Sequence, residues 1–86
     1  MNDLEKYRSQ IDTIDKNILA LLAKRREVVL KVGEYKKQNN LEILQKNRWE
    51  EVLRTKKELA KKFDLDTNFV ETIWNEIHKY SLKIEK

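Results

Sequence analysis

Apolar residues recur at intervals of three and four positions along the first 38 residues of the chain. This spacing places them on one side of a continuous α-helix, which we expect to run from about Asp3 to Gln38. Asn2 precedes this helix as a candidate N-cap, and Asn39 and Asn40 follow it as a helix stop. The positions that form the apolar stripe are Leu4, Tyr7, Ile11, Ile14, Ile18, Leu21, Val28, Val32 and Tyr35.

Two residues interrupt this stripe. Arg25 occupies the apolar register between Leu21 and Val28, where a charge is costly unless an anionic group meets it. Gly33 lies in the helix interior and costs about 1 kcal/mol relative to Ala, so we expect another helix to pack closely against it.

The expected helix is longer than a compact domain of this size is wide. Some 35 residues span about 50 Å at 1.5 Å per residue. A compact domain of 86 residues has a radius of gyration of about 12 Å and hence a diameter of about 30 Å. The striped helix would therefore project beyond its own domain, and a self-associating helical dimer would cover it.

The rest of the chain predicts two shorter helices. Residues 41–46 form an ordered connection, and a second helix runs from about Asn47, its expected N-cap, to Phe63. Asp66 is the expected N-cap of a third helix, from about Thr67 to the C-terminus. The inner positions would be Trp49, Val52, Leu53, Leu59, Ala60 and Phe63 in the second helix, and Val70, Ile73, Trp74, Ile77 and Ile84 in the third. We expect an all-α fold, with one domain over residues 1–86 and its three helices as antiparallel neighbours in a bundle.

Composition excludes several classes of protein. The chain has no Pro and one Gly, which rules out a turn-rich β fold, and 40% hydrophobic residues in a periodic pattern are too many for disorder. With no Cys and His78 as the only His, we expect no disulfide, no thiolate metal site and no His cluster for zinc or iron. No apolar run approaches a membrane span, so we expect a cytoplasmic protein without membrane contact. The net charge of +4 is interspersed, which favours a local cationic site over a nucleic-acid surface.

Polar residues fall on inward registers in two of the expected helices. Lys36 lies eleven residues after Arg25, about 20° away around an ideal helix, so both cations point the same way. Ser81 continues the apolar stripe of the last helix, and Glu85 follows one turn later on the same face. These residues could line an anion site. The alternative for the cations is a buried salt bridge to a neighbouring helix or side chains that snorkel to water, and for Ser81 it is a hydrogen bond to the residue-77 carbonyl.

Arg8 is a further cation on the first helix. It is offset from Arg25 by about 100° around the helix axis, so one helix cannot aim both at a single ligand. In a dimer, Arg8 could reach the site of the other protomer.

The order of these residues resembles the all-helical (AroQ-type) chorismate mutase family. The pattern R-x2-I-D-x-I-D-x3-L-x-L-L-x2-R-R-x5-V-G-x2-K runs from Arg8 to Lys36, and Arg48 and I-H-x2-S at Ile77 to Ser81 continue it. The match covers essentially the whole chain, and its spaced polar residues are ones that packing alone would not choose.

The resemblance implies an intertwined homodimer with two active sites, each completed by an arginine of the other protomer. The family converts chorismate, a dicarboxylate, to prephenate by an intramolecular Claisen rearrangement in phenylalanine and tyrosine biosynthesis. It uses no nucleophile, metal, cofactor or covalent intermediate. Catalysis then rests on clamping the reactive conformation and on preorganised donors at the ether oxygen, where negative charge grows.

The resemblance also implies roles for individual residues. Arg25 and the partner's Arg8 would bind the two substrate carboxylates, because planar guanidinium forks bind carboxylates strongly. Lys36 would donate to the ether oxygen and help to hold a carboxylate, and Ser81 would bind a carboxylate at the far wall. Arg48 would line the pocket and tie the connection to the second helix.

Three positions depart from the family pattern. Gln45 stands where the family often has Asp. Trp49 stands where the family has an acid, so backbone near Gln45 or a water would hold the substrate hydroxyl, and Trp49 is either a pocket residue or a core aromatic. Glu85 stands where many members carry Gln, and a protonated Glu would donate to the ether oxygen as Gln does, whereas an ionised Glu would repel the growing charge.

The sequence is also compatible with three other functions. An isochorismate-pyruvate lyase of the same fold would use a similar cationic pocket. A non-catalytic helical dimerisation or regulatory module would need no pocket, and its Arg25 and Lys36 could be replaced without loss of a ligand. A nucleic-acid-binding helical protein would require binding that depends steeply on salt.

Overall fold

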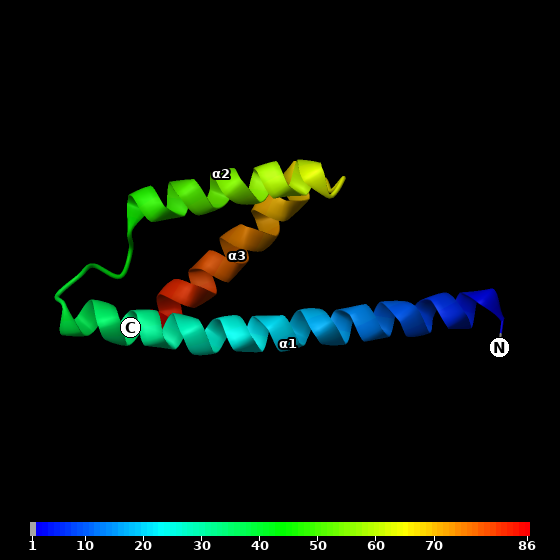
Figure 1. Ribbon diagram of the computed structural model, residues 1–86, viewed down its shortest axis with the longest axis horizontal. Helices are drawn as coiled ribbons and strands as arrows, with labels where there is room; N and C mark the ends of the chain where they lie inside the picture. The colour runs from blue at the N-terminus through cyan, green and yellow to red at the C-terminus, as the bar shows by residue number, and fades with distance from the viewer. Residues whose placement is uncertain (1) are drawn as a thin grey trace.

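The computed structural model describes residues 2–86 and contains three α-helices and, within those residues, no strand. They are α1 (Asp3–Gln38), α2 (Lys46–Lys62) and α3 (Thr67–Glu85), shown in Figure 1. The predicted all-α class, with one long helix and two shorter ones, is confirmed. No helix of this part of the chain is long and apolar enough to cross a membrane.

Asparagines define both ends of α1, as the sequence predicts. The Asn2 side chain accepts a hydrogen bond from the Glu5 backbone N–H at 2.8 Å, which satisfies one of the free amides of the first turn. At the other end Asn39 is the C-cap, and Asn40 adopts φ 54° in the left-handed region that Asn tolerates.

The start of α2 differs from the prediction. The helix begins at Lys46 with Gln45 as its N-cap, so Asn47 already lies inside the helix and the prediction of an Asn47 cap is wrong. The Gln45 side chain donates to the Glu42 carbonyl at 2.7 Å, and this local turn takes the place of a side-chain cap. In α3, Asp66 accepts from the Phe69 N–H at 3.0 Å, which confirms the predicted cap.

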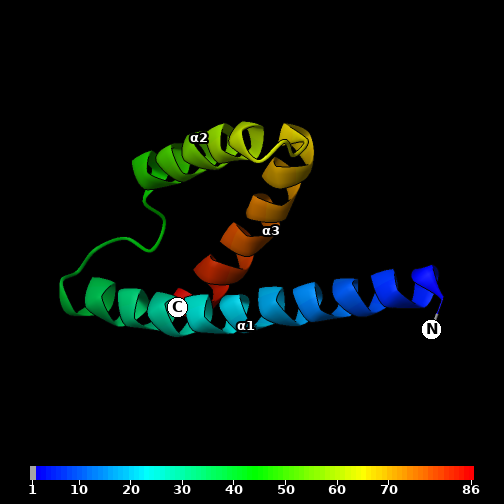
Figure 2. The same cartoon turned by 45° about the vertical axis from the view of Figure 1, so that its right-hand side comes forward.

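The helix α3 lies between the other two and packs against both of them. Its C-terminal end meets α1 at Gly33, which is buried against the backbone of Glu85, so the predicted close packing at Gly33 is confirmed. Figures 1 and 2 show α2 and α1 held apart, with α3 crossing obliquely from one to the other. The expectation that all three helices are antiparallel neighbours is therefore wrong, because α1 and α2 form no backbone contact within residues 2–86.

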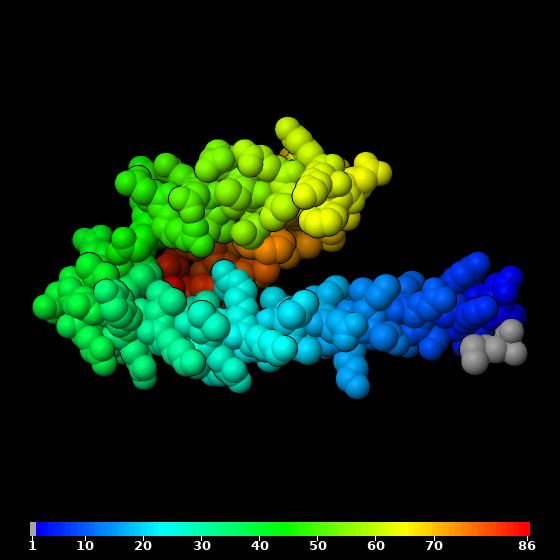
Figure 3. All heavy atoms as spheres, viewed as in Figure 1, coloured from blue at the N-terminus to red at the C-terminus, as the bar shows by residue number. Residues whose placement is uncertain are grey.

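The molecule is elongated, with extents of 57 × 25 × 16 Å and a radius of gyration of 16.4 Å, against about 12 Å for a compact chain of this length. Figure 3 shows the N-terminal half of α1 projecting beyond the rest. The apolar stripe of that half is exposed to solvent along its length, as the sequence predicts for a single chain.

The chain buries little apolar surface by itself. Among the described residues the buried hydrophobic side chains are Ala60 and Val70, and no large side chain is fully enclosed. Leu59 and Phe63, expected on the inner side of α2, are 43% and 65% exposed, so that expectation is wrong for a single chain. They line an open apolar groove near the turn between α2 and α3.

Candidate active site

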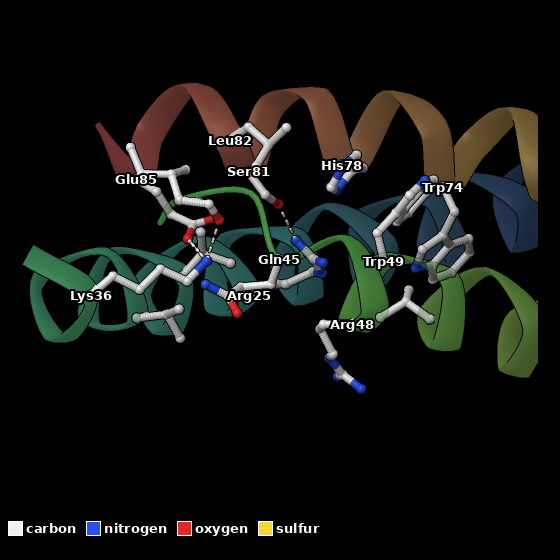
Figure 4. A pocket seen from close by; sticks show the side chains of 14 residues that line it. Arg25, Lys36, Gln45, Arg48, Trp49, Trp74, His78, Ser81, Leu82 and Glu85 are labelled. Carbon is white, nitrogen blue, oxygen red and sulfur yellow. Dashed lines mark hydrogen bonds and ion pairs between the residues drawn. The ribbon is translucent and has the colours of Figure 1, made fainter. Parts of the chain in front are cut away.

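A cavity of about 230 Å³ lies where all three helices and the connection between α1 and α2 converge. Figure 4 shows the side chains that line it. Of the eight site residues expected from the sequence, the structure brings seven to this cavity. They are Arg25, Lys36, Gln45, Arg48, Trp49, Ser81 and Glu85.

Lys36 links α1 both to α3 and to the connection between α1 and α2. Its Nζ donates to Glu85 Oε1 at 2.5 Å and to the Ile43 carbonyl oxygen at 2.5 Å. The Lys36 and Glu85 side chains are only 14% and 7% exposed, so each charge is compensated by the other. This is the salt bridge between neighbouring helices that the sequence offered as an alternative for Lys36. Because Lys36 also binds the Ile43 carbonyl, it fixes the connection between α1 and α2, as expected for an ordered segment.

Arg25 reaches α3 through Ser81. The guanidinium Nη1 donates to Ser81 Oγ at 2.7 Å, and the same hydroxyl donates to the Ile77 carbonyl at 2.9 Å. The predicted hydrogen bond of Ser81 to the residue-77 carbonyl is therefore confirmed, and the hydroxyl serves Arg25 as well. This bond orients the guanidinium toward the cavity.

Gln45 and Arg48 line the mouth of the cavity at the start of α2. Arg48 forms an ion pair with Glu51 one turn later on its own helix, and both side chains are largely exposed. The expectation that Arg48 ties the connection to α2 is therefore wrong, because the connection is held by Lys36 and by the Gln45 side chain.

Trp49 and His78 form a stacked pair at one wall of the cavity. The ring centroids are 3.9 Å apart and the planes differ by 10°, with Trp49 from α2 and His78 from α3. Burial lowers the pKa of His78 from its ordinary value, the nearby cations Arg25 and Lys36 lower it further, and only Glu85 acts in the opposite direction. The ring is thus favoured in its neutral form.

His78 is a polar residue of the cavity that was not expected there from the sequence, because a single His suggests no metal site. Helical spacing could have found it. It lies four residues after Trp74, three before Ser81 and seven before Glu85, on the face of α3 that lines the cavity.

Arg8 is absent from this cavity. It lies 17 residues before Arg25 on the same helix, about 26 Å away along the axis, and pairs with Glu5 at 3.6 Å on the exposed N-terminal half. Within a single chain it cannot contact a ligand bound beside Arg25.

The cavity favours a small anion. Arg25, Lys36 and Arg48 supply cationic donors, whereas Glu85 is the one acidic residue that lines it among the described residues. Residues 2–86 contain no group of three or more His, Cys, Asp or Glu that could hold a metal ion. The arrangement suits an organic acid clamped between α1 and α3.

Comparison with known proteins gives concordant matches. A family model described as chorismate mutase type II matches residues 7–86. The bifunctional chorismate mutase/prephenate dehydratase of Buchnera aphidicola subsp. Schizaphis graminum is 40% identical over 85 residues, which are 99% of this chain and 22% of that protein. The T-protein of Enterobacter agglomerans is 32% identical over 83 residues, covering 96% of this chain and 22% of its own length.

A solved structure is similar as well. A conserved hypothetical protein from Pyrococcus furiosus superimposes with a TM-score of 0.79 and 34% sequence identity, covering 100% of this chain and 99% of that one. By contrast, this chain spans about a fifth of the length of the curated relatives that it matches.

Proposed function

The chain belongs to the chorismate mutase type II family, and from this membership we propose that it converts chorismate to prephenate in the cavity between α1 and α3. The observation that carries the proposal is the convergence of Arg25 and Lys36 from one face of α1 on Ser81 and Glu85 of α3. These four polar residues line one cavity of about 230 Å³, and this lining supports a small anionic ligand.

The proposed reaction needs little covalent chemistry from the protein. Within one molecule the ether C–O bond breaks while a C–C bond forms, and no proton, electron or group enters or leaves. The transition state separates charge, with negative charge growing on the ether oxygen. A protein accelerates such a step by holding the reactive conformer and by placing fixed donors at that oxygen.

Lys36 is the proposed donor to the ether oxygen. An ammonium group has three N–H donors, and two of them go to Glu85 and to the Ile43 carbonyl. The third is available to a ligand, and the two existing bonds hold the ammonium in position. Preorganisation of this kind makes a donor effective, because it needs no rearrangement as the charge develops.

Arg25 is the proposed anchor of one substrate carboxylate, and Ser81 lies beside it. The guanidinium has five N–H groups, of which the bond to Ser81 uses one, so a bidentate contact to a carboxylate is open to it. Arg48 at the mouth would add positive potential, which favours entry of a dianion.

The Glu85 carboxylate forms an ion pair with Lys36, and we propose that it takes up a proton when the substrate binds and acts in its protonated form. Its carboxyl group adjoins Lys36, so a ligand's ether oxygen that approaches Lys36 also approaches Glu85. A protonated carboxyl donates a hydrogen bond to that oxygen, whereas an ionised one repels its growing charge.

We propose an intertwined homodimer as the active form. The exposed apolar stripe of α1, and a single chain whose buried hydrophobic residues among those described are Ala60 and Val70, support a second copy as the cover. In such a dimer the partner's Arg8 would complete each site and bind the second carboxylate.

The loss of chorismate absorbance on adding the purified chain tests the proposed function. We expect conversion with prephenate as the product. If chorismate is untouched and isochorismate yields pyruvate, the chain is a lyase of the same fold. If a folded dimer turns over neither substrate, a non-catalytic dimerisation module is the better account.

A further inference from the structure

The stacked pair of Trp49 and His78 is the part of the cavity that the proposed mechanism leaves unused. Figure 4 shows His78 pointing into the cavity from α3, between Ser81 and the Trp49 ring. The Trp49 ring, whose centroid lies 3.9 Å from that of the imidazole, covers one face of His78. The imidazole can therefore form hydrogen bonds only in its ring plane, at the two nitrogens. Within residues 2–86 neither nitrogen forms a hydrogen bond with the protein, which leaves both for a ligand.

The position of the pair within the cavity limits what it can bind. Arg25 and Ser81 lie on one side of His78, and Lys36 and Glu85 lie further along the same cavity. Those charged groups suit the carboxylates and the ether oxygen of a dicarboxylate enol ether. The Trp49 wall presents an apolar ring and one neutral heteroaromatic edge, so it suits a neutral polar group of the ligand.

Burial, together with the cations of α1, favours the neutral form of the His78 ring. Arg25 and Lys36 face it from α1, Arg48 lines the same cavity from α2, and Glu85 faces it from α3. Burial and the two α1 cations lower the pKa of His78, against the opposing effect of Glu85. A neutral imidazole carries one donor and one acceptor, which is the complement of a hydroxyl group.

We propose that His78, held in orientation by stacking on Trp49, contacts the ring hydroxyl of the substrate and makes the site specific for a hydroxylated ring. The inference rests on the proposed function, because chorismate carries one ring hydroxyl besides its two carboxylates and its ether oxygen. His78 then supplies the contact at the wall where Trp49 stands, and Trp49 is a positioning residue that acts through His78.

The test compares chorismate with its analogue that lacks the ring hydroxyl, each assayed with the wild-type chain and with His78→Leu. In the wild type, we expect the missing hydroxyl to lower kcat/KM by about 10-fold or more, because a polar site rejects a ligand that leaves it unpaired. In His78→Leu both compounds should react with kcat/KM within about 3-fold of each other, because the leucine has no group to pair. His78→Gln, which retains a donor and an acceptor, should restore part of the discrimination.

Two further variants separate contact from packing. Trp49→Leu removes the stack and should reduce the hydroxyl discrimination, with the cost appearing mainly in KM. Lys79→Leu changes the next residue of α3, which is exposed and paired with Glu76, and should retain the full discrimination. This variant controls for a general disturbance of the helix.

The His78 resonance gives an independent readout. Because the chain has one His, its imidazole proton signal in NMR needs no assignment. The signal should show a neutral ring at pH 7 and should shift when the product prephenate, which also carries a ring hydroxyl, is added.

Several outcomes would overturn the inference. Equal discrimination by the wild type and His78→Leu would show that His78 only packs. Discrimination that stays intact in Trp49→Leu would remove Trp49 as the positioning residue. Tighter substrate binding at low pH, lost in His78→Leu, would mean that a charged imidazolium binds a carboxylate instead. No turnover of chorismate by the wild-type chain would overturn the proposed function and this inference with it.

Discussion

Gly33 and Glu85 bring the backbones of α1 and α3 into direct contact. A Cβ added at Gly33 would lie 2.9 Å from both the Cα and the carbonyl oxygen of Glu85. Three residues beyond Gly33, Lys36 Nζ meets the Glu85 carboxylate at 2.5 Å. The absence of one side chain on α1 thus sets the distance across which the two charged groups of the site pair.

Gly33→Ala should weaken both folding and catalysis. The added methyl group meets backbone atoms, which cannot rotate away, so α3 must move. Overpacking costs about 1–3 kcal/mol and exceeds the gain in helix propensity of up to about 1 kcal/mol. We expect the free energy of unfolding to fall by up to about 2 kcal/mol in denaturant titrations, and turnover to fall with it. Glu34→Ala, the exposed next residue, is the control, and a more stable Gly33→Ala would contradict the close packing.

Turnover should depend on the protonation of Glu85. Because the proposed donor is the protonated carboxyl, kcat/KM should fall as the pH rises, and Glu85→Gln should flatten this dependence because an amide donates at every pH. Rate profiles from acid to alkaline pH for both proteins measure the effect. A flat wild-type profile, together with a harmless Glu85→Ala, would remove Glu85 from the mechanism.

His78 should make stability depend on pH. Burial first, and then Arg25 and Lys36, lower its pKa below the ordinary value of 6.5 in the folded chain, so the unfolded chain binds more protons in this range. The stabilisation from the neutral ring is fully present above about 6.5 and is lost as the pH falls toward the lowered pKa. Denaturation of the wild type and His78→Phe at one protein concentration should show a larger acid loss for the wild type. An equal loss of stability in acid for the wild type and His78→Phe would refute the lowered pKa of His78.

Mixing two inactive variants should restore activity if the sites are shared. Arg8→Ala and Arg25→Ala homodimers each lack one proposed carboxylate anchor at both sites. In a mixed dimer one site has both arginines and the other has neither. After unfolding and refolding together, half of the dimers are mixed, so activity should return to about a quarter of the wild-type value. No recovery, with mixed dimers shown by mass spectrometry, would contradict the shared site.

The sequence predicted the three helices and four polar residues of the cavity because both depend on local periodicity, whereas Gln45, Arg48 and Trp49 were expected there from the family resemblance. Arg25 and Lys36 are eleven residues apart on α1, and Ser81 and Glu85 are four apart on α3, so helix geometry alone aligns each pair. The apolar stripe and its flanking asparagines predict the bounds of α1 correctly.

The remaining features depend on contacts between segments, which periodicity does not encode. Asn47 looked like a cap, yet the Gln45–Glu42 turn starts α2 two residues earlier. The stack of His78 on Trp49 requires α3 to cross between α1 and α2, whereas a simple antiparallel bundle was expected. Arg48 was assigned to the connection, but Glu51 on its own helix is the nearer partner.

The most direct test of the account uses adjacent arginines as a matched pair. Arg25 faces the cavity and Ser81, whereas Arg26, the next residue, donates to the Tyr80 hydroxyl at 3.1 Å on an exposed surface. Each Ala substitution removes the same charge, and circular dichroism checks that both variants are folded. With chorismate, we expect Arg25→Ala to lose about 100-fold or more in kcat/KM, because it removes a charged clamp, and Arg26→Ala to stay near the wild type. Equal activity of the two variants, or no conversion by a folded wild-type dimer, would contradict the central claim.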